Sequence, residues 1–384
     1  LNGDTSLFYY AGNEKLRTTT TGITVTGEVA ATQDYANFKP TLDLNFVAEK
    51  KLDPRITYQR TGPASFTNEF GKVVIVGDNA PRFDHDTDTG ECKGLLIEES
   101  RTNIATYSND YSQFGGYNVT KTANNAVAPD GTTTAAKIEH GGSGTSYLDK
   151  IYNNINAAGA GSYTYSVWLK APDDQPDGYY GCAIAVLHST GGNVEPTVSL
   201  NKTWTRYSVT KTFGASDPGK LRVHLVMFRA SPGSTYDGKV IPSYVWAWGA
   251  QIEAGAFATS YIPAAGATRG MENVTITGDD FTDFYNPLES TAVCQFDTSN
   301  WITYNNNKYE RIFAFGNHNT ETDTFEVFKQ NSSNSEERYR VRTANSNVLG
   351  AANYSYGTNT TPKVAFALKL NDAAVTVDGG TPGG

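Results

Sequence analysis

Short runs of alternating apolar and polar residues fill most of this chain, and turn-forming residues separate the runs. A period of two places successive side chains on opposite faces, which is typical of β-strands that bury one face. No stretch carries a long apolar period of 3.6 residues, so we expect few helices, with 96–107 as the best short candidate. The pattern therefore predicts an all-β fold.

The runs are most regular between residues 101 and 270. They recur there at intervals that are typical of a β-sandwich or barrel, and Gly, Pro, Asn and Asp mark the turns. We therefore predict a jelly-roll β-sandwich in this region. Its expected strands lie at 135–138, 163–169, 182–187, 205–212, 221–228 and 244–252.

The flanking regions indicate an elongated, multi-domain chain. Residues 1–33 hold strand-like runs but are too short to bury a core alone, so we expect a fibre-stem or oligomerisation element, with a disordered leader as the alternative. Residues 34–100 form a β-rich lead-in segment. Residues 288–384 alternate again and predict part of a second sandwich that continues in a longer polypeptide. Outside the jelly roll, strands are expected at 42–47, 56–58, 73–76, 95–97, 291–296, 311–315, 325–328, 339–341, 364–370 and 374–377.

Residues 271–287 look like an acidic linker between the two sandwiches. From Met271 to Asn307 there are six acidic residues and no Lys or Arg. We interpret this stretch as a solvated connection, and a cation site is the alternative.

Composition narrows the classes of function. The formal net charge is -9 and the pI is near 5.1. An acidic surface repels the phosphate backbone, so nucleic-acid binding is not expected. No run approaches the roughly 18 apolar residues of a membrane helix, so membrane insertion is not expected either. The three cysteines lie far apart, and we interpret them as reduced, buried thiols.

Enzyme signatures are absent from the sequence. It has no Gly-x-Ser-x-Gly nucleophile motif, no phosphate-binding or dinucleotide-binding glycine motif, and no histidines at metal-ligand spacing. We therefore predict a protein that is not an enzyme and has no cofactor. Glycoside cleavage, however, needs only two carboxylates at a suitable separation, so a tailspike-type polysaccharide depolymerase remains open.

One acidic turn resembles a calcium loop. Asp84, Asp86 and Asp88 alternate and are followed by Gly90. Calcium takes several carboxylate oxygens from one tight turn, so these three residues are the candidate metal ligands. The spacing departs from the helix-flanked calcium loop, and a solvated turn with internal hydrogen bonds is the alternative.

Aromatic residues are the candidates for sugar contacts, because a pyranose ring stacks its C–H face on Trp or Tyr. In 163–170, period two places Trp168 on the face opposite the apolar core residues. That is where a binding surface would put it, unless loops cover it. Tyr179 and Tyr180 follow in a loop that is rich in Gly and Asp. Trp301, in a polar loop, is a further candidate, with packing as its alternative.

Other aromatic residues are assigned to packing. Trp246 and Trp248 share one strand face with Tyr244 and Ile252, and such an apolar stripe predicts core. Trp204 is expected to be structural.

Three arginines, Arg338, Arg340 and Arg342, alternate along one expected strand and would share a face. They could bind sulfate, phosphate or carboxylate groups of a surface glycan. The alternative is cross-strand pairing with acids such as Glu326.

Several segments resemble known families. The run Pro81-Arg82-Phe83-Asp84-His85-Asp86, with Thr89-Gly90-Glu91, Gly94 to Glu99 and Arg101-Thr102-Asn103, resembles a segment of bacteriophage tail fibres and related host-contact appendages. In that group it leads into a sugar-binding type of β-sandwich. Pro129 to Thr132, Tyr163 to Trp168, Trp204 to Tyr207 and Trp248 to Glu253 resemble the carbohydrate-binding jelly roll. Ala367 to Asp372 with Val375 to Gly379 resembles the laminin-G or concanavalin-like sandwich.

The resemblance implies a structural virion protein on the particle exterior, namely a tail fibre or similar appendage. It implies a homotrimer that contacts other virion proteins and attaches to host surface glycans as an adhesin. Many weak sugar contacts would then add up through avidity. Two alternatives are a head decoration or connector with a purely structural role, and a tailspike-type depolymerase.

Overall fold

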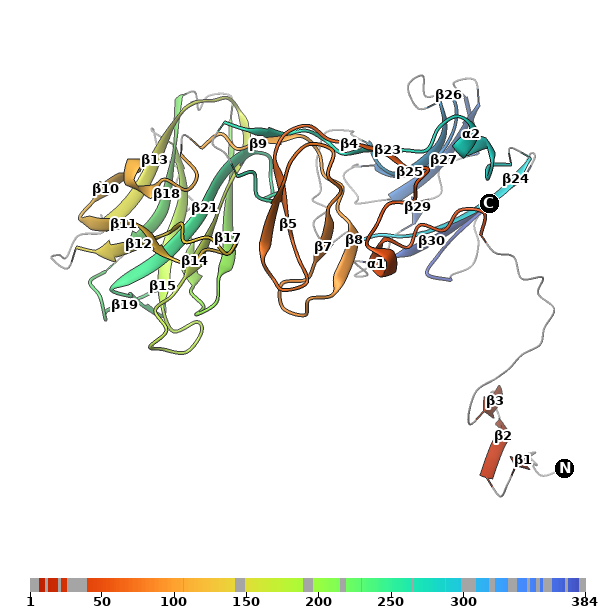
Figure 1. The fold of residues 1–384 in the computed structure, drawn as a ribbon, viewed down its shortest axis with the longest axis horizontal. Coiled ribbons are helices and arrows are strands. Elements are labelled where there is room, and N and C mark those ends of the chain that lie inside the picture. The colour runs from red at the N-terminus through yellow and green to blue at the C-terminus, as the bar shows by residue number, and fades with distance from the viewer. Residues whose placement is uncertain are drawn as a thin grey trace. The chain divides into compact units, whose positions relative to one another are not determined.

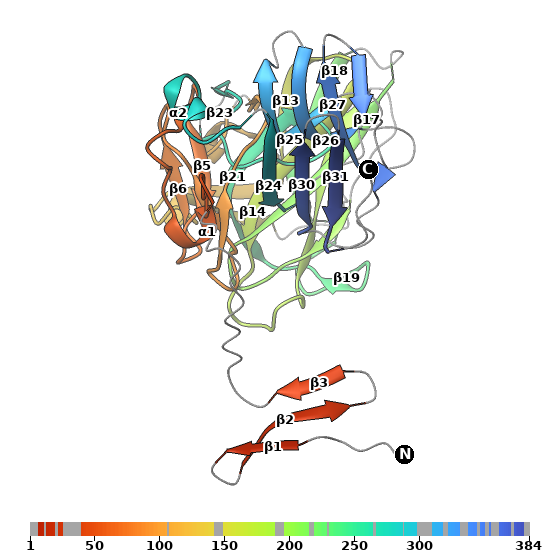
Figure 2. The same cartoon turned by 90° about the vertical axis from the view of Figure 1, so that its right-hand side faces the viewer.

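The computed structural model describes residues 7–10, 13–19, 22–25, 40–105, 107–141, 149–188, 196–214, 219–228, 230–263, 266–286, 288–297, 309–317, 322–330, 337–343, 346–349, 353–354, 361–369 and 372–379. Contacts divide the chain into two compact units, Leu1–Asp43 and Leu44–Gly384. Strands dominate both views of the fold (Figures 1 and 2), so the all-β prediction is confirmed. No helix in the described ranges is long and apolar enough to cross a membrane.

The first unit contains a small antiparallel sheet. Its strands are β1 (Leu7–Tyr10), β2 (Asn13–Thr19) and β3 (Gly22–Val25), paired in the order β1-β2-β3. The strand-like runs expected in the stem element are therefore present.

The jelly roll consists of two antiparallel five-stranded sheets. Sheet A has the order β10 (Gly115–Tyr117), β13 (Asp149–Ala158), β18 (Gly219–Phe228), β15 (Gly181–His188) and β16 (Thr197–Ser199). Sheet B has the order β11 (Val119–Ala126), β12 (Ala135–His140), β21 (Tyr244–Ala254), β14 (Gly161–Lys170) and β17 (Thr205–Phe213). All six strands expected in this region form. The short elements η1 (Tyr111–Gln113), β19 (Thr235–Tyr236) and β20 (Lys239–Val240) complete it.

Each sheet contributes one face to a common core. Alternate residues of β14, Tyr165, Val167 and Leu169, meet Ile184 and Val186 from β15, and all five are fully buried. This is the face that period two predicts for β14. The other face of each sheet points away from the core.

The lead-in segment and the residues that follow the jelly roll lie side by side. The lead-in segment holds α1 (Phe46–Glu49), β4 (Thr57–Gln59), β5 (Ala64–Thr67), β6 (Val73–Val76), β7 (Phe83–His85), β8 (Cys92–Leu95) and β9 (Arg101–Thr102). β9 pairs with β22 (Thr268–Arg269), and β4 pairs with β23 (Asn273–Thr275). The chain therefore returns to the lead-in segment after it leaves the sandwich.

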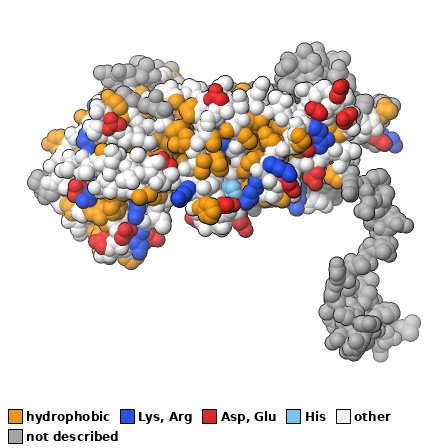
Figure 3. All heavy atoms as spheres, in the orientation of Figure 1, with side chains coloured by type: hydrophobic (Ala, Val, Ile, Leu, Met, Phe, Trp, Pro, Cys, Tyr) orange, Lys and Arg blue, Asp and Glu red, His pale blue; other side chains and the backbone are white. Residues whose placement is uncertain are grey.

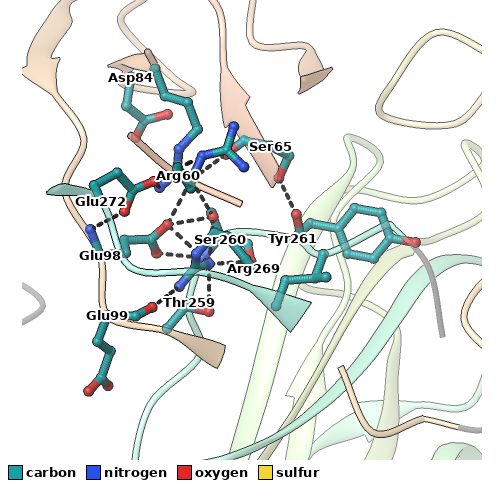
Figure 4. Close-up of polar contacts among 12 residues, drawn as sticks. Arg60, Ser65, Asp84, Glu98, Glu99, Thr259, Ser260, Tyr261, Arg269 and Glu272 are labelled. Atoms are coloured by element: carbon teal, nitrogen blue, oxygen red, sulfur yellow. Dashed lines mark hydrogen bonds and ion pairs between the residues drawn. The ribbon is translucent and has the colours of Figure 1, made fainter. Parts of the chain in front are cut away.

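A buried cluster of charged side chains joins these two stretches (Figure 4). Glu98 accepts from Arg82 Nη1 at 2.7 Å and from Arg269 Nη1 at 3.1 Å. Glu272 pairs with Arg82 Nη2 and lies 3.4 Å from Arg60 Nε. The three arginines and Glu272 are almost fully buried. Arg82 and Glu98 both lie in the segment 81–103, so polar residues of that segment contribute to a buried network of ion pairs.

Four expectations for these regions are wrong. The strand expected at 95–97 does not form, because β8 ends at Leu95. Residues 96–107 form no helix where they are described, because their polar groups bond to distant segments, as when Glu98 N donates to Glu272. The strand expected at 42–47 does not form: residues 43–45 have no regular structure, and α1 begins at Phe46. The acidic stretch after Met271 is not wholly solvated, because Glu272 is buried among arginines.

The C-terminal region contains two further antiparallel sheets. One has the order β24 (Glu289–Gln295), β30 (Lys363–Lys369) and β31 (Asp372–Val377). The other has the order β25 (Tyr309–Asn317), β26 (Thr322–Gln330), β27 (Glu337–Thr343) and β28 (Ser346–Leu349), with β29 (Asn353–Tyr354) also paired to β27. The helix α2 (Asp279–Thr282) precedes them. The strands expected here form.

Candidate functional site

The outer face of sheet A carries a row of residues that spans four strands. Gly115 of β10 is paired with Tyr152 of β13, Tyr152 with His224 of β18, and His224 with Ala185 of β15. The residues next to them in sequence, such as Val223, belong to the core, so this row faces outward.

Further outward residues border this row. Lys150 and Asn154 are two positions on either side of Tyr152, and Arg222 is two positions before His224. We call the whole set the His224 surface: Gly115, Tyr117, Lys150, Tyr152, Asn154, Ala183, Ala185, Arg222 and His224.

His224 is the most unusual residue of this surface. Its side chain is 3% exposed, and neither ring nitrogen has a hydrogen-bond partner within the described part of the chain. Leaving a buried polar group without a partner costs about 1–3 kcal/mol. Burial, followed by the charges of Lys150 and Arg222, lowers the pKa of His224 to about 3. The ring is therefore neutral at neutral pH, with one donor and one acceptor to offer.

Tyr152 supplies an aromatic ring beside His224. The two ring centroids are 6.4 Å apart at an interplanar angle of 62°. A Cβ atom on Gly115 would lie 2.5 Å from the Tyr152 ring, so the ring lies across the neighbouring strand β10 at a place where only glycine leaves room. Tyr117, farther along β10, is 54% exposed. Rings of this kind suit stacking against the apolar face of a sugar.

Polar groups surround these rings. The Arg222 guanidinium carbon lies 5.4 Å from the centroid of the Tyr152 ring. Arg222 Nε donates to Asn154 Oδ1 at 2.7 Å, which fixes the guanidinium beside the ring. Arg222 and Asn154 are exposed, whereas Ala183 and Ala185 are fully buried. The surface thus combines a buried base of small residues with an exposed rim of hydrogen-bonding groups.

The outer face of sheet B carries a second aromatic group, which the sequence assigned to the core. Val245 and Ala247 face the core at one end of β21, and Ala250 and Ile252 face it at the other. Regular alternation would separate core residues by two positions, but Ala247 and Ala250 are three positions apart. This irregular spacing arises at a β-bulge, where the register with β14 shifts and Gly249 has a φ of 65°.

Because of the bulge, odd-numbered positions of β21 face the core before Gly249 and even-numbered positions face it afterwards. Tyr244, Trp246 and Trp248 therefore point away from the core, and the prediction that they share the core face with Ile252 is wrong.

Tyr244 and Trp246 are half-buried, and each has a lysine beside its ring that is paired with an acidic residue. Their rings meet edge to face at 4.8 Å. The ammonium group of Lys137 lies 4.3 Å from the Tyr244 centroid, and that of Lys170 lies 5.1 Å from the Trp246 centroid. Lys137 also pairs with Glu139 at 2.8 Å, and Lys170 pairs with Asp173 at 3.4 Å. The rings of Tyr244 and Trp246 are therefore already in contact with lysines of the protein, and these lysines are paired with acidic residues.

Trp168, a predicted sugar contact, lies on this same outer face but is packed among other side chains. Its ring meets Trp248 at 5.3 Å and Tyr261 at 5.5 Å. Arg206 covers it, with the guanidinium carbon 4.4 Å from the ring centroid. Val73 of the lead-in segment belongs to the same cluster. The packing alternative for Trp168 fits this geometry, and its contact with a sugar remains a prediction.

Tyr179 and Tyr180 lie together in the loop before β15. Their rings meet at 5.1 Å, and Tyr179 is 43% exposed. Tyr180 donates from its hydroxyl to Asp174 at 3.2 Å. Their role in sugar binding remains a prediction.

The candidate calcium ligands do not converge. Asp84 accepts from Thr67 N at 2.7 Å, and Asp86 accepts from the backbone of Asp88 and Thr89 at 3.0 Å each. The described residues contain no group of three or more His, Cys, Asp or Glu placed to hold a metal ion. The calcium interpretation does not fit this geometry, because hydrogen bonds to the backbone direct the carboxylates to separate places.

The remaining predicted contacts fall in the C-terminal region. Trp301 lies outside the described residues. Arg338, Arg340 and Arg342 lie in β27, and Arg340 is paired in register with Glu326 of β26. That register fits the cross-strand alternative, and their binding role remains a prediction.

The cysteines are unpaired. Cys182 is buried, and Cys92 and Cys294 are half-buried. Burial raises the pKa of Cys182 and that of Cys294 to about 12, so both thiols stay protonated at neutral pH.

Comparisons with known proteins give only distant likenesses. No protein-family model matches the chain, and no curated protein matches it. Among solved structures, the CBM22-1–GH10 modules of the Clostridium thermocellum xylanase 10B, complexed with xylohexaose, are 14% identical with a TM-score of 0.28. The match covers 41% of this chain and 29% of that one, so the chain spans less than a third of that protein.

Two others are similarly distant. The CBM22-2 xylan-binding domain of Paenibacillus barcinonensis Xyn10C is 9% identical, with a TM-score of 0.28 and coverage of 40% of this chain and 98% of that one. The enzymatically active domain of tailspike protein 4 of bacteriophage CBA120 is 9% identical, with a TM-score of 0.27 and coverage of 41% and 21%. TM-scores below 0.5 establish neither family nor function.

Proposed function

We propose that this chain is a glycan-binding attachment protein and that the His224 surface holds the sugar. The single observation that carries the proposal is the buried, neutral His224 beside Tyr152, with both ring nitrogens unpartnered among the described residues. A sugar hydroxyl both donates and accepts, so it would satisfy the neutral imidazole once binding opens the buried ring to the ligand. The ring of Tyr152 offers an apolar face on which the pyranose ring of the same sugar can stack.

We further propose that the chain belongs to a phage tail fibre or similar appendage on the particle exterior. The support is the segment from Pro81 to Asn103, which resembles such proteins and directly precedes the jelly roll. The small sheet of the first unit would associate with two other copies, and three copies would supply avidity to weak sites. The purified chain would then be trimeric in sedimentation equilibrium and would lose that state without residues 1–43.

Glycan-array binding of the full chain tests the proposed site. We expect defined glycans to bind, and Tyr152→Ala to weaken that binding by about tenfold, which corresponds to about 1.4 kcal/mol of stacking. Trp246→Ala is the matched control, because it removes an aromatic ring from the outer face of the other sheet. Equal losses in both variants, or no binding at all, would refute this site.

We propose binding without cleavage. Incubation of the full chain with capsule polysaccharide or lipopolysaccharide should leave the polymer length unchanged. Shortened products would instead indicate a depolymerase.

A further inference from the structure

The jelly roll meets the lead-in segment through two kinds of contact. One kind is apolar: Val73 of β6 packs with Trp248 and Tyr261 of the jelly roll. The other kind is polar and charged, and Figure 4 shows it. Apolar contacts depend on the area removed from water and have no preferred direction, whereas hydrogen bonds have narrow preferred angles. The polar contacts are therefore the ones that can specify the angle between the two parts.

Ser260 brings the jelly roll into the polar part of this joint. It lies shortly after β21, and its hydroxyl donates to Glu98 Oε2 at 2.6 Å and accepts from Arg82 Nη1 at 2.6 Å. Its backbone N–H donates to Glu98 Oε1 at 2.8 Å. The carbonyl oxygen of the next residue, Tyr261, accepts from Ser65 Oγ at 2.7 Å. Two successive residues of the jelly roll are thus each bonded to the lead-in segment.

The partners of Ser260 are themselves held by other groups. Arg82 Nη1 also donates to Ser65 O at 2.8 Å, and Arg82 Nη2 pairs with Glu272. Glu98 pairs with Arg269 of β22 as well as with Arg82. The side chains of Arg82, Arg269 and Glu272 are 0% exposed, so water does not compete for their bonds. Each charged group therefore has several partners that must all be satisfied in one arrangement.

Burial makes this arrangement selective. If the jelly roll turned relative to the lead-in segment, Ser260 would leave Arg82 and Glu98, and these charges would lose a partner in a place that water does not reach. Buried charges that lose a partner are strongly disfavoured, even where the complete network adds little net stability. A network of this kind discriminates between orientations more sharply than an apolar contact does.

We infer that the polar cluster around Ser260 fixes the angle at which the jelly roll is attached to the lead-in segment. The apolar cluster at Val73 stabilises the attachment, and the arginine–glutamate pairs select one orientation. The outer faces of both sheets, including the His224 surface, are then presented in one direction relative to the lead-in segment. This inference goes beyond glycan binding and does not depend on it.

The distance between two spin labels tests the inference in the full chain. The labels replace Lys93 of β8 and Ser208 of β17, which are both exposed. The half-buried Cys92 and Cys294 are first replaced by serine, and the buried Cys182 stays in place. Double electron–electron resonance should give a single narrow distance distribution. A broad distribution in this parent chain would overturn the inference.

One substitution removes the centre of the network and keeps the length of the side chain. Arg82→Met should give a broader distribution or a second distance, while near-ultraviolet circular dichroism shows that the jelly roll stays folded. Arg206→Met is the matched control, because the Arg206 guanidinium donates to Thr259 O and Ser166 Oγ within the jelly roll, and its distribution should stay narrow. Equal distributions in Arg82→Met and in the parent chain would overturn the inference.

Ser260→Ala decides the question if Arg82→Met does not fold. It removes the hydroxyl between Arg82 and Glu98 and should also broaden the distribution, and an unchanged narrow distribution would overturn the inference. Glycan binding is a separate readout of the parent chain. A broad distribution in a chain that binds glycans refutes the fixed joint and leaves the proposed function standing. A narrow distribution in a chain that binds no glycan does the reverse.

Discussion

Acidification should destabilise the jelly roll through His224 in a pH window that can be calculated. In the folded chain the pKa of His224 is about 3, because the ring is buried beside Lys150 and Arg222. In the unfolded chain it returns to about 6.5. Below pH 6.5 the unfolded state therefore binds a proton that the folded state does not. The stabilisation that His224 provides is complete above pH 6.5 and is lost as the pH falls toward 3.

The magnitude follows from the difference between the two pKa values. Each pH unit inside the window contributes about 1.4 kcal/mol, so lowering the pH from 7 to 5 costs about 2 kcal/mol. At pH 5 most carboxylates are still ionised, including Asp53 and Asp86, whose pKa values are about 2. The histidine contribution can thus be read before acid unfolding of carboxylate pairs begins.

Urea unfolding at pH 7, 6 and 5 provides the measurement. Four of the five tryptophans lie in the jelly roll, so their fluorescence reports mainly on this domain. The wild-type chain should lose about 2 kcal/mol more than His224→Gln between pH 7 and pH 5, whatever the absolute stability of the variant. Equal pH slopes in the two proteins would show that His224 is not buried in an unpaired, neutral form.

Three substitutions test the packing that surrounds the sheets. Glu98→Gln leaves the buried Arg269 without its carboxylate and removes one of the two carboxylates paired with Arg82, so it should cost about 3–5 kcal/mol in urea unfolding, whereas Glu49→Gln, in an exposed ion pair, should have a much smaller effect. Gly249→Ala should cost more than Gly233→Ala: both glycines have positive φ, but only at Gly249 does the new Cβ meet a ring, 2.7 Å away. Trp168→Ala should lower the unfolding free energy by about 2 kcal/mol without selective loss of glycan binding, and an unchanged melting temperature would contradict its packing role.

Period-two alternation predicted six of the ten strands in the two sheets of the sandwich and missed β10, β11, β13 and β16. In β14 the apolar residues Tyr165, Val167 and Leu169 recur at every second position, and each one reaches the core. Such a signal is local, because the pleat alone decides which face a side chain takes. The fold class and most strands could therefore be derived from the sequence.

The facing of β21 could not be derived from alternation alone. Gly249 interrupts the strand with a left-handed conformation, and the bulge exchanges the faces on its two sides. The signal was present in Trp246-Ala247-Trp248-Gly249, because an isolated glycine in a strand often marks a bulge. Reading it would have placed both tryptophans on the outer face.

The His224 surface and the arginine–glutamate cluster depend on contacts between distant residues. Tyr152 and His224 become neighbours only through the pairing of β13 with β18. Glu98 meets Arg269 only because the chain returns to the lead-in segment. Alternation predicts strands but not which strands pair. The sequence therefore could not predict the His224 surface or the arginine–glutamate cluster.

Hydrophobic side chains are also visible on the face shown in Figure 3, interspersed with charged ones. Exposed apolar residues such as Phe70 and Met271 contribute to the surface of the protein. Figure 3 shows hydrophobic side chains gathered across the middle of this face.

The central claim is that a sugar contacts the outer face of sheet A, and nuclear magnetic resonance can test it directly. The ring Cε1–H signal of His224, assigned with His224→Gln, and the indole N–H signal of Trp246, assigned with Trp246→Phe, report on the two outer faces. On titration with a glycan that binds, the His224 signal should shift and saturate while the Trp246 signal stays in place. A shift at Trp246 with no change at His224 would contradict the account.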